Sequence, residues 1–385
     1  MTGFGAEEAS VYSDSFDVYT GNANPGLARR ICRYLGVELG AAEVFQFANE
    51  NIFVRILDNV REKDVFLVQP TCRPVNRSIM ELLIMIDAFK RASAGRITAV
   101  VPYYAYGRSD KKDQPRVPIT ARLVADMITV AGADRVLSMD LHQGQIQGFF
   151  NIPVDELTAV HLLSNYFRQK HLENLVVVTD LGFAKRARTF AELLDAPLAI
   201  IEKRRVGNLD RAEVMNVIGE VRGRRAIFVD DEIDTAGTLL EVVRALQREG
   251  VEEIFACATH GILSDAAVDR IAASGLSEIV LTDSIPLPPD KRLPQITTLS
   301  VAPLIGEAIR RIHRGESVGA LFSSEVTLTQ EMILWEDGVE HTLDARTGAH
   351  LEGDHATAEQ LDRAGEPAAP APSATAQPAS IPGDR

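Results

Sequence analysis

The first half of the chain alternates short apolar runs with longer segments whose apolar residues recur at helical spacing. Apolar runs of this length predict buried strands, and the helical spacing predicts amphipathic helices between them. In order, the predicted elements are strand 64–69, helix 78–92, strand 97–101, helix 118–131 and strand 135–139. Strands that alternate with helices in this way are typical of an α/β domain with a parallel sheet.

The second half of the chain repeats this order. The predicted elements are strand 175–178, helix 184–194, strand 198–201, strand 226–228, strand 253–258, a helix near 266–273, strand 278–282 and helix 302–313. Neither half closely repeats the sequence of the other, but each contains a strand that ends in acidic residues. We therefore predict two similar α/β domains, residues 12–157 and residues 158–322.

The character of the sequence changes after Phe322. Residues 326–334 and 339–343 have the pattern of two strands around an Asp-Gly turn, which predicts a small appendage with the form of a hairpin within residues 323–350. Residues 351–385 are predicted to be a disordered tail, because their Ala- and Pro-rich end cannot build a core. We expect the region beyond Phe322 to contribute little to activity.

Composition and charge narrow the class of protein. The chain has 385 residues, of which 46% are hydrophobic and 24% charged, as is ordinary for globular proteins. No apolar stretch is long enough to span a membrane and no signal pattern opens the chain, so we expect a cytoplasmic protein without a membrane partner. The net charge of −14 argues against nucleic acid as a partner. The three cysteines are far apart and are expected to be buried thiols.

The most informative segment follows the strand predicted at 226–228. Asp230 and Asp231 are expected in an acidic turn, and Asp234, Thr235, Ala236, Gly237 and Thr238 form a loop before a helical pattern. Backbone N–H groups at the start of a helix bind phosphate, whereas paired carboxylates suit ribose hydroxyls or a Mg²⁺ ion. The segment therefore predicts a pocket for a ribose 5-phosphate group. The alternative is an ordinary strand–helix turn in which Asp234 or Thr235 caps the helix.

Four further segments carry polar residues at places where α/β proteins bind ligands. Residues 106–116 form a charged loop, either a solvated surface loop or a lid over polyphosphate. Asp140 and His142 could share a metal ion, or His142 could be a hydrogen-bonded structural residue. Asp180 follows one predicted strand, and the basic residues 203–205 follow another, at the sheet edge where ligands bind.

Together these segments resemble one family. Residues 47–322 are similar to the ribose-phosphate diphosphokinases, also called phosphoribosyl pyrophosphate synthetases. The matching motifs lie at residues 81–88, 91–100, 117–121, 139–142, 145–150, 203–205, 229–231, 234–238 and 258–261. The resemblance implies an α/β fold of two tandem phosphoribosyltransferase-type (type I) domains with parallel central sheets, followed by a C-terminal tail, and assembly as a homo-hexamer.

The resemblance also implies a reaction and roles for residues. The family transfers the diphosphoryl group of ATP to the 1-hydroxyl of ribose 5-phosphate, with Mg²⁺ as cofactor. Ribose 5-phosphate would be bound by Arg205, Asp230, Asp231, Asp234, Thr235, Ala236, Gly237 and Thr238. The catalytic residues would be Lys203 and Arg205, and the Mg²⁺ ligands would be His142, Asp180 and Asp140. The residues that would bind ATP are Phe47, Asn49, Asn51, Arg108 and Ser109.

The sequence departs from the family pattern on the ATP side. Asn49 and Asn51 stand where the family has carboxylates, and Ser109 stands in the basic loop where the family has Gln. Amides accept hydrogen bonds through oxygen and also donate, so adenine recognition is expected to follow a changed pattern. Two alternatives in function are a catalytically silent regulatory subunit of similar fold and a phosphoribosyltransferase that consumes the diphosphate sugar.

Overall fold

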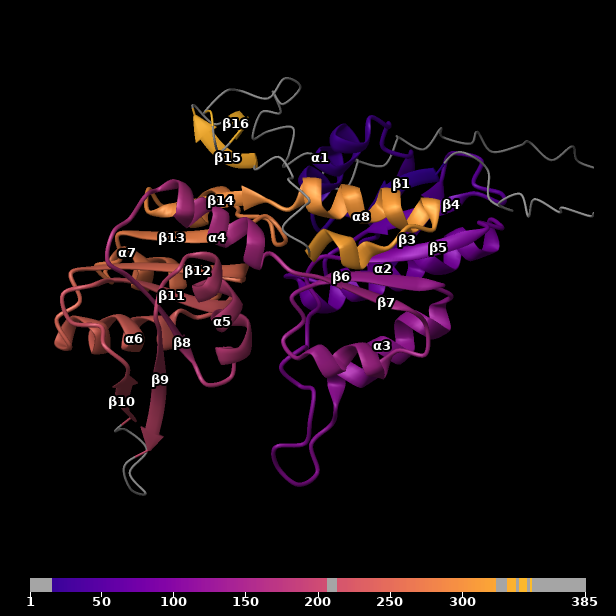
Figure 1. The fold of residues 1–385 in the computed structure, drawn as a ribbon. Helices are drawn as coiled ribbons and strands as arrows, with labels where there is room; N and C mark the ends of the chain where they lie inside the picture. The colour runs from indigo at the N-terminus through magenta and orange to yellow at the C-terminus, as the bar shows by residue number, and fades with distance from the viewer. Residues whose placement is uncertain (1–15, 206–212, 323–330, 337–338, 345–346, 348–385) are drawn as a thin grey trace, which may run out of the picture.

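The computed structural model of the protein describes residues 16–205, 213–322, 331–336, 339–344 and 347. This part of the chain forms an N-terminal half and a C-terminal half, each built on its own sheet (Figure 1). The last predicted segment, residues 351–385, lies outside the described residues. None of the described helices is both long enough and apolar enough to cross a membrane.

The sheet of the N-terminal half has five strands, all parallel, in the order β1-β4-β5-β6-β7. The strands are β1 Phe16–Thr20, β4 Asp64–Val68, β5 Arg96–Val101, β6 Arg135–Met139 and β7 Val154–Leu157, and the helices are α1 Pro25–Leu35, α2 Val75–Arg91 and α3 Thr120–Ala131. A 3-10 turn, η1, covers Gly144–Phe149. Every residue of β4 is buried, because helices cover both faces of this sheet.

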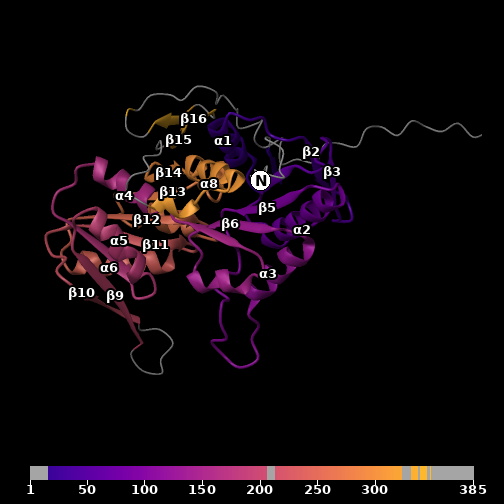
Figure 2. The same cartoon turned by 45° about the vertical axis from the view of Figure 1, so that its right-hand side comes forward.

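A separate antiparallel hairpin extends from the N-terminal half. It consists of β2 Ala42–Gln46 and β3 Ile52–Ile56, and β3 packs against α2. Figure 2 shows this hairpin at the outer side of the N-terminal half, away from the C-terminal sheet. In the described part of the chain, the hairpin therefore belongs to the N-terminal half.

The sheet of the C-terminal half has nine strands in the order β10-β9-β8-β11-β12-β13-β14-β15-β16. The strands are β8 Leu175–Asp180, β9 Leu198–Arg205, β10 Glu213–Ile218, β11 Arg225–Ile233, β12 Glu253–Gly261, β13 Glu278–Thr282, β14 Ile296–Ser300, β15 Glu331–Glu336 and β16 Val339–Asp344. The helices are α4 Val160–Gln169, α5 Ala184–Leu193, α6 Gly237–Arg248, α7 Ala267–Ala272 and α8 Ala302–Arg314, with 3-10 turns η2 Pro289–Lys291 and η3 Val318–Phe322. The six central strands are parallel, so the predicted α/β fold with parallel central sheets is confirmed.

The predicted hairpin near the end of the chain belongs to the edge of this sheet. β15 pairs antiparallel with both β14 and β16, through Leu299 and Met332 on the one side and Met332 and Leu343 on the other. Residues 326–330 and the turn at 337–338 lie outside the described residues. The division of the chain into domains at residues 157 and 322 stays a prediction.

The two halves share a hydrophobic core. Buried residues of α1, α4, α5 and α8 pack there with residues of both sheets, including Ile31, Phe167, Phe190, Ile305 and Val177. Helix α8 follows β14 of the C-terminal sheet but packs against α1 of the N-terminal half. A core common to both halves favours a fixed relative placement of the two sheets, since large apolar interfaces resist domain motion.

Candidate active site

The site begins at the carboxyl end of β11. The sequence predicted an acidic turn after Phe228, which is wrong, because β11 continues to Ile233 and pairs with β12 as far as Gly261. Asp230, Asp231 and Glu232 are therefore strand residues. Successive side chains of a strand point to opposite faces, so Asp230 and Glu232 share one face and Asp231 takes the other.

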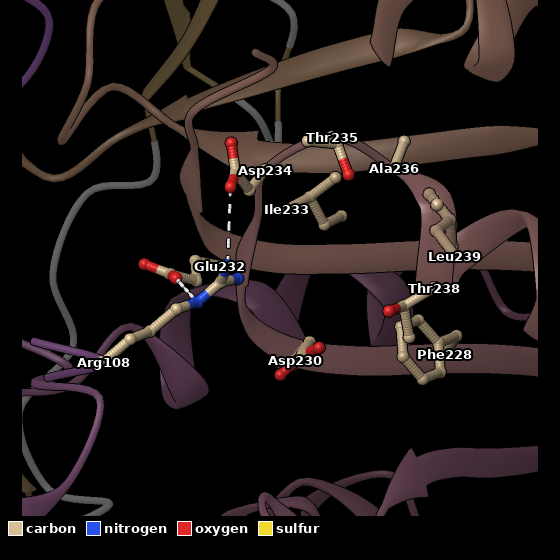
Figure 3. A pocket seen from close by; sticks show the side chains of 11 residues that line it. Arg108, Phe228, Asp230, Glu232, Ile233, Asp234, Thr235, Ala236, Thr238 and Leu239 are labelled. Atoms are coloured by element: carbon tan, nitrogen blue, oxygen red, sulfur yellow. Dashed lines mark hydrogen bonds and ion pairs between the residues drawn. The ribbon is translucent and has the colours of Figure 1, made fainter. Parts of the chain in front are cut away.

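A pocket of about 90 Å³ lies where β11 passes into α6. Its lining includes Asp230, Glu232, Asp234, the following residues 235–239 and Arg108 (Figure 3). Ala236 adopts a left-handed conformation with φ of 57° and occupies the position before the first turn of α6. No side chain caps this helix, so the alternative in which Asp234 or Thr235 is the capping residue is not supported. The helix start with its positive dipole end remains directed at the pocket, as a phosphate site requires.

Two carboxylates meet at the ends of neighbouring strands beside this pocket. Val178 of β8 pairs with Phe228 of β11, and Asp180 and Asp230 each lie two residues further on. Burial raises the pKa of Asp230 well above its usual value, and the charges of Asp231 and Asp180 raise it further. Hydroxyl donors or a divalent cation would relieve this crowding of negative charge.

Arg108 reaches the pocket from the N-terminal half. It lies in the loop between β5 and α3, and its guanidinium forms ion pairs with Glu232 through Nε and with Asp234 through Nη1, the latter at 3.4 Å. Burial raises the pKa of Glu232 to about 7, although Arg108 acts in the opposite direction. Of the five residues predicted to bind ATP, Arg108 is the one that lines this pocket.

His142 and Asp140 have different partners. His142 Nδ1 donates a hydrogen bond to Asp231 Oδ2 at 2.7 Å, and this bond raises the pKa of His142. Burial raises the pKa of Asp231, but the hydrogen bonds that its carboxylate accepts from His142 and from the Asp230 carboxyl group lower this pKa overall. Asp140 has a φ of 36°, and its Oδ2 accepts from Thr259 Oγ1 at 2.6 Å and from the amide of residue 159 at 2.8 Å. The left-handed turn thus separates the two side chains that an extended backbone would align.

The residues predicted to bind Mg²⁺ do not form a complete group of metal ligands among the described residues. Within the described ranges, no three His, Cys, Asp or Glu residues are grouped to hold a metal ion. The donors nevertheless fit Mg²⁺, which is usually held by one or two carboxylates together with water and substrate phosphates. Asp180 beside Asp230 supplies such carboxylates, at the ends of two neighbouring strands. The assignment of His142, Asp180 and Asp140 as ligands stays a prediction.

The predicted catalytic residues lie on β9. Lys203 pairs with Met215 of β10 and Arg205 pairs with Glu213, so their backbone continues β9 beyond Ile201, the partner of Asp180. Their side chains lie outside the described residues. The roles of Lys203 and Arg205 therefore stay predictions.

The remaining residues predicted to bind ATP do not line the pocket. Phe47, Asn49 and Asn51 are in the turn of the β2–β3 hairpin, where Asn49 Oδ1 accepts from the Asn51 amide at 3.2 Å. The side chain of Phe47 is 47% exposed and its ring contacts Phe45 and Phe53. Ser109 Oγ accepts from the first amide of α3 at 3.3 Å, which is a capping role. Within one chain, the structure brings Arg108 to the pocket and leaves these residues elsewhere.

Glu232 is the site residue that the sequence analysis missed. It lines the pocket and holds Arg108, but the strand was predicted to end before it. The signal was present in the spacing, because Asp230 and Glu232 are two residues apart and share a face once β11 is recognised as a long strand.

The parallel sheets, the loop before α6 and the acids on β11 define a protein of the phosphoribosyltransferase structural class with two such halves. Two family models match: the N-terminal domain of ribose phosphate pyrophosphokinase at residues 16–132, and the phosphoribosyl synthetase-associated domain at residues 207–323. The chain belongs to the ribose-phosphate pyrophosphokinase family and is an enzyme of that family.

Individual relatives support this assignment. Over 314 residues the chain is 56% identical to the ribose-phosphate pyrophosphokinase of Caldanaerobacter subterraneus, a match that covers 81% of this chain and 99% of the relative. It is 52% identical over 307 residues to that of Gloeobacter violaceus, covering 79% and 92%. The crystal structure of phosphoribosylpyrophosphate synthetase from Mycobacterium smegmatis matches with a TM-score of 0.75 and 44% identity, covering 78% of this chain and all of the other.

Proposed function

We propose that the pocket before α6 binds ribose 5-phosphate and that the enzyme transfers the diphosphoryl group of ATP to the 1-hydroxyl of this sugar. The products are 5-phosphoribosyl 1-diphosphate and AMP, which supply nucleotide biosynthesis. The observation that carries the proposal is the uncapped start of α6 next to Asp230 in one pocket. A helix start suits the 5-phosphate, and a carboxylate suits the sugar hydroxyls.

The protein's contribution to this reaction is positioning and charge stabilisation. Phosphoryl transfer needs little covalent chemistry from the enzyme, and the described site contains polar and charged groups for binding. The residues 234–238 would hold the 5-phosphate, and Asp230 would orient the ribose. Arg108 would contact the ATP phosphates, while Lys203 and Arg205 would neutralise charge on the group in transfer.

Mg²⁺ is the proposed cofactor. When bound, the ion neutralises charge on the phosphate oxygens of the nucleotide. Asp180 and His142 are the proposed protein ligands. Asp140, whose Oδ2 accepts a hydrogen bond from Thr259, is the third proposed ligand.

We propose that a second copy of the chain supplies the residues that contact the adenine of ATP. The β2–β3 hairpin with Phe47, Asn49 and Asn51 lies on the outer side of its own N-terminal half (Figure 2). We propose that it serves the pocket of a neighbouring subunit within a homo-hexamer. We also propose a cytoplasmic location, which the three buried, free cysteines and the proposed substrates support.

The test is to incubate the full chain with ribose 5-phosphate, Mg²⁺ and ATP and to measure AMP and 5-phosphoribosyl 1-diphosphate. Formation of both products in equal amounts, dependent on ribose 5-phosphate, is expected. A folded protein that binds ribose 5-phosphate but forms no AMP would be the silent regulatory subunit. Turnover only in the direction that consumes 5-phosphoribosyl 1-diphosphate and a nucleobase would make the protein a phosphoribosyltransferase.

A further inference from the structure

Glu232 and Arg108 connect the two halves of the protein at the entrance of the pocket. Arg108 comes from the loop after β5 in the N-terminal half, and Glu232 comes from β11 in the C-terminal half. Figure 3 shows the guanidinium of Arg108 directed at Glu232 and Asp234. The contact therefore fixes a residue of one half over the ligand site of the other.

The burial of the two partners differs. The side chain of Glu232 is 8% exposed, whereas that of Arg108 is 54% exposed. A buried carboxylate without a partner is costly, so Glu232 has a strong requirement for a cation. Arg108 has alternatives, because an exposed guanidinium can be solvated in many rotamers. The pair thus restricts Arg108 far more than it restricts Glu232.

The geometry leaves part of the guanidinium for a ligand. Arginine has five N–H donors in a planar fork. Glu232 pairs with Nε of Arg108 and Asp234 pairs with Nη1, so these two contacts do not use the donors of Nη2. Asp234 belongs to the loop before α6 and Glu232 shares a strand face with Asp230, so both anchors are parts of the sugar-phosphate pocket.

We propose that Glu232 is a positioning residue that, together with Asp234, holds Arg108 at the mouth of the pocket with its remaining donors free for a phosphate of the nucleotide. Glu232 thereby couples occupancy of the ribose-phosphate pocket to nucleotide binding across the two halves. The inference rests on the proposed function, because it assigns the anion that Arg108 meets to the phosphates of ATP. A fixed guanidinium binds phosphate with less loss of rotamer entropy than a mobile one.

The test is a double-mutant cycle with Glu232→Gln and Arg108→Ala, measured as KM for ATP and kcat at saturating ribose 5-phosphate. In the wild-type background, Glu232→Gln is expected to raise KM for ATP by about tenfold, with a smaller change in kcat. In the Arg108→Ala background, the same substitution is expected to change KM less than about twofold. Glu241→Gln on α6 is the matched control for loss of a carboxylate and should leave both constants unchanged.

Several outcomes would overturn the inference. Equal losses from Glu232→Gln in both backgrounds would show that it acts through the fold and not through Arg108. A lower KM for ATP in Glu232→Gln would show that Glu232 competes with the nucleotide for Arg108. Glu232→Asp keeps the charge and shortens the reach, so it should give an intermediate KM and provides a second test if the Gln variant does not fold. A wild-type enzyme that forms no AMP would refute the proposed function instead.

Discussion

Arg30 and Asp283 form an ion pair at 2.9 Å in the interior of the protein, with side chains 5% and 4% exposed. The pair joins α1 of the N-terminal half to the segment that follows β13 in the C-terminal half. Asp283 also accepts hydrogen bonds from Ser300 Oγ at 2.8 Å and from the Val301 amide at 2.7 Å. The carboxylate is therefore well satisfied, which is the condition under which a buried ion pair persists.

We predict that Arg30→Met destabilises the protein substantially. The methionine fills similar space but leaves Asp283 as a buried charge without its cation, a change that typically costs about 3–5 kcal/mol. The free energy of unfolding, measured with urea, should fall by an amount in this range.

The control for this prediction is Arg122→Ala, which removes an exposed pair with Asp126 on α3. Exposed pairs of this kind contribute roughly 1 kcal/mol or less. Similar small losses for both variants would contradict the importance given to the Arg30–Asp283 pair.

The central strands and several helices were predictable because their environment is uniform. Strands such as β4 are buried on both faces and therefore appear in the sequence as continuous apolar runs. Helix α1 was not predicted, although Leu27, Ala28, Ile31 and Cys32 are buried at helical spacing, and nothing local in the sequence shows that Arg30 is buried among them. Its partner Asp283 is distant in sequence, and only the folded chain brings the two together.

The site was predictable only where its residues are close together in the sequence. The loop before α6 is local, so one segment of the sequence contains most residues that line the pocket. The contact of Arg108 with Glu232 joins residues from different halves, and no local pattern encodes it. Asp140 and His142 were expected to point the same way, but the left-handed turn at Asp140 separates them. Backbone turns of this kind are decided by tertiary contacts, here those of Asp140 with Thr259.

We predict that Asp230→Asn weakens the binding of ribose 5-phosphate by about tenfold or more, since hydrogen bonds to a charged group contribute about 1.5–3 kcal/mol. An amide can accept only part of the hydrogen bonds that a carboxylate accepts from sugar hydroxyls. Calorimetric titration should show little change in ATP binding. Equal losses of affinity for ribose 5-phosphate and for ATP would refute the assignment of this carboxylate to the sugar.

We predict that Lys203→Ala lowers kcat far more than it raises KM for ribose 5-phosphate. A cation at the extended end of β9 is proposed to act on charge that develops in the transition state. Loss of one such contact costs roughly 3–4 kcal/mol, or a few hundredfold in rate. Steady-state kinetics separates the two constants, and a change confined to KM would make Lys203 a binding residue only.

We predict that Glu331 makes stability depend on pH. Burial raises the pKa of Glu331, although Arg33 at 3.2 Å acts in the opposite direction. A raised pKa in the folded state means that the stability from this group is present below the unfolded pKa of about 4.3 and is lost as the pH rises through the folded value. Relative to Glu331→Gln, the wild type should therefore lose stability as the pH rises from 4 toward neutrality, as measured by urea unfolding.

Glu249→Gln, at the exposed end of α6, is the control for simple loss of a carboxylate. A difference between wild type and Glu331→Gln that stays constant with pH, or one that grows in favour of the wild type, would contradict the predicted sign. The direction matters because an ordinary ion pair would give the opposite trend.

We predict that truncation after Phe322 lowers the stability of the protein, whereas truncation after Thr347 does not. The shorter protein loses β15 and β16, which leaves the edge of β14 unpaired and removes the ion pair of Glu331 with Arg33. It also uncovers the part of the shared core against which Met332 packs. Loss of buried Ile333 and Leu343 adds to this cost. We expect its unfolding temperature to fall by about 5 °C or more, since each kcal/mol corresponds to roughly 2–4 °C in domains of about 150–250 residues.

The site residues lie elsewhere, so the kcat of the folded truncated protein should stay within about threefold of the full-length value, because changes away from such features have small energetic effects. Truncation after Thr347 keeps both strands and should leave stability and activity unchanged, which makes it the matched control. Calorimetry and the AMP assay on both proteins separate the two effects. Equal unfolding temperatures of the two truncated proteins would show that β15 and β16 contribute no stability to the sheet.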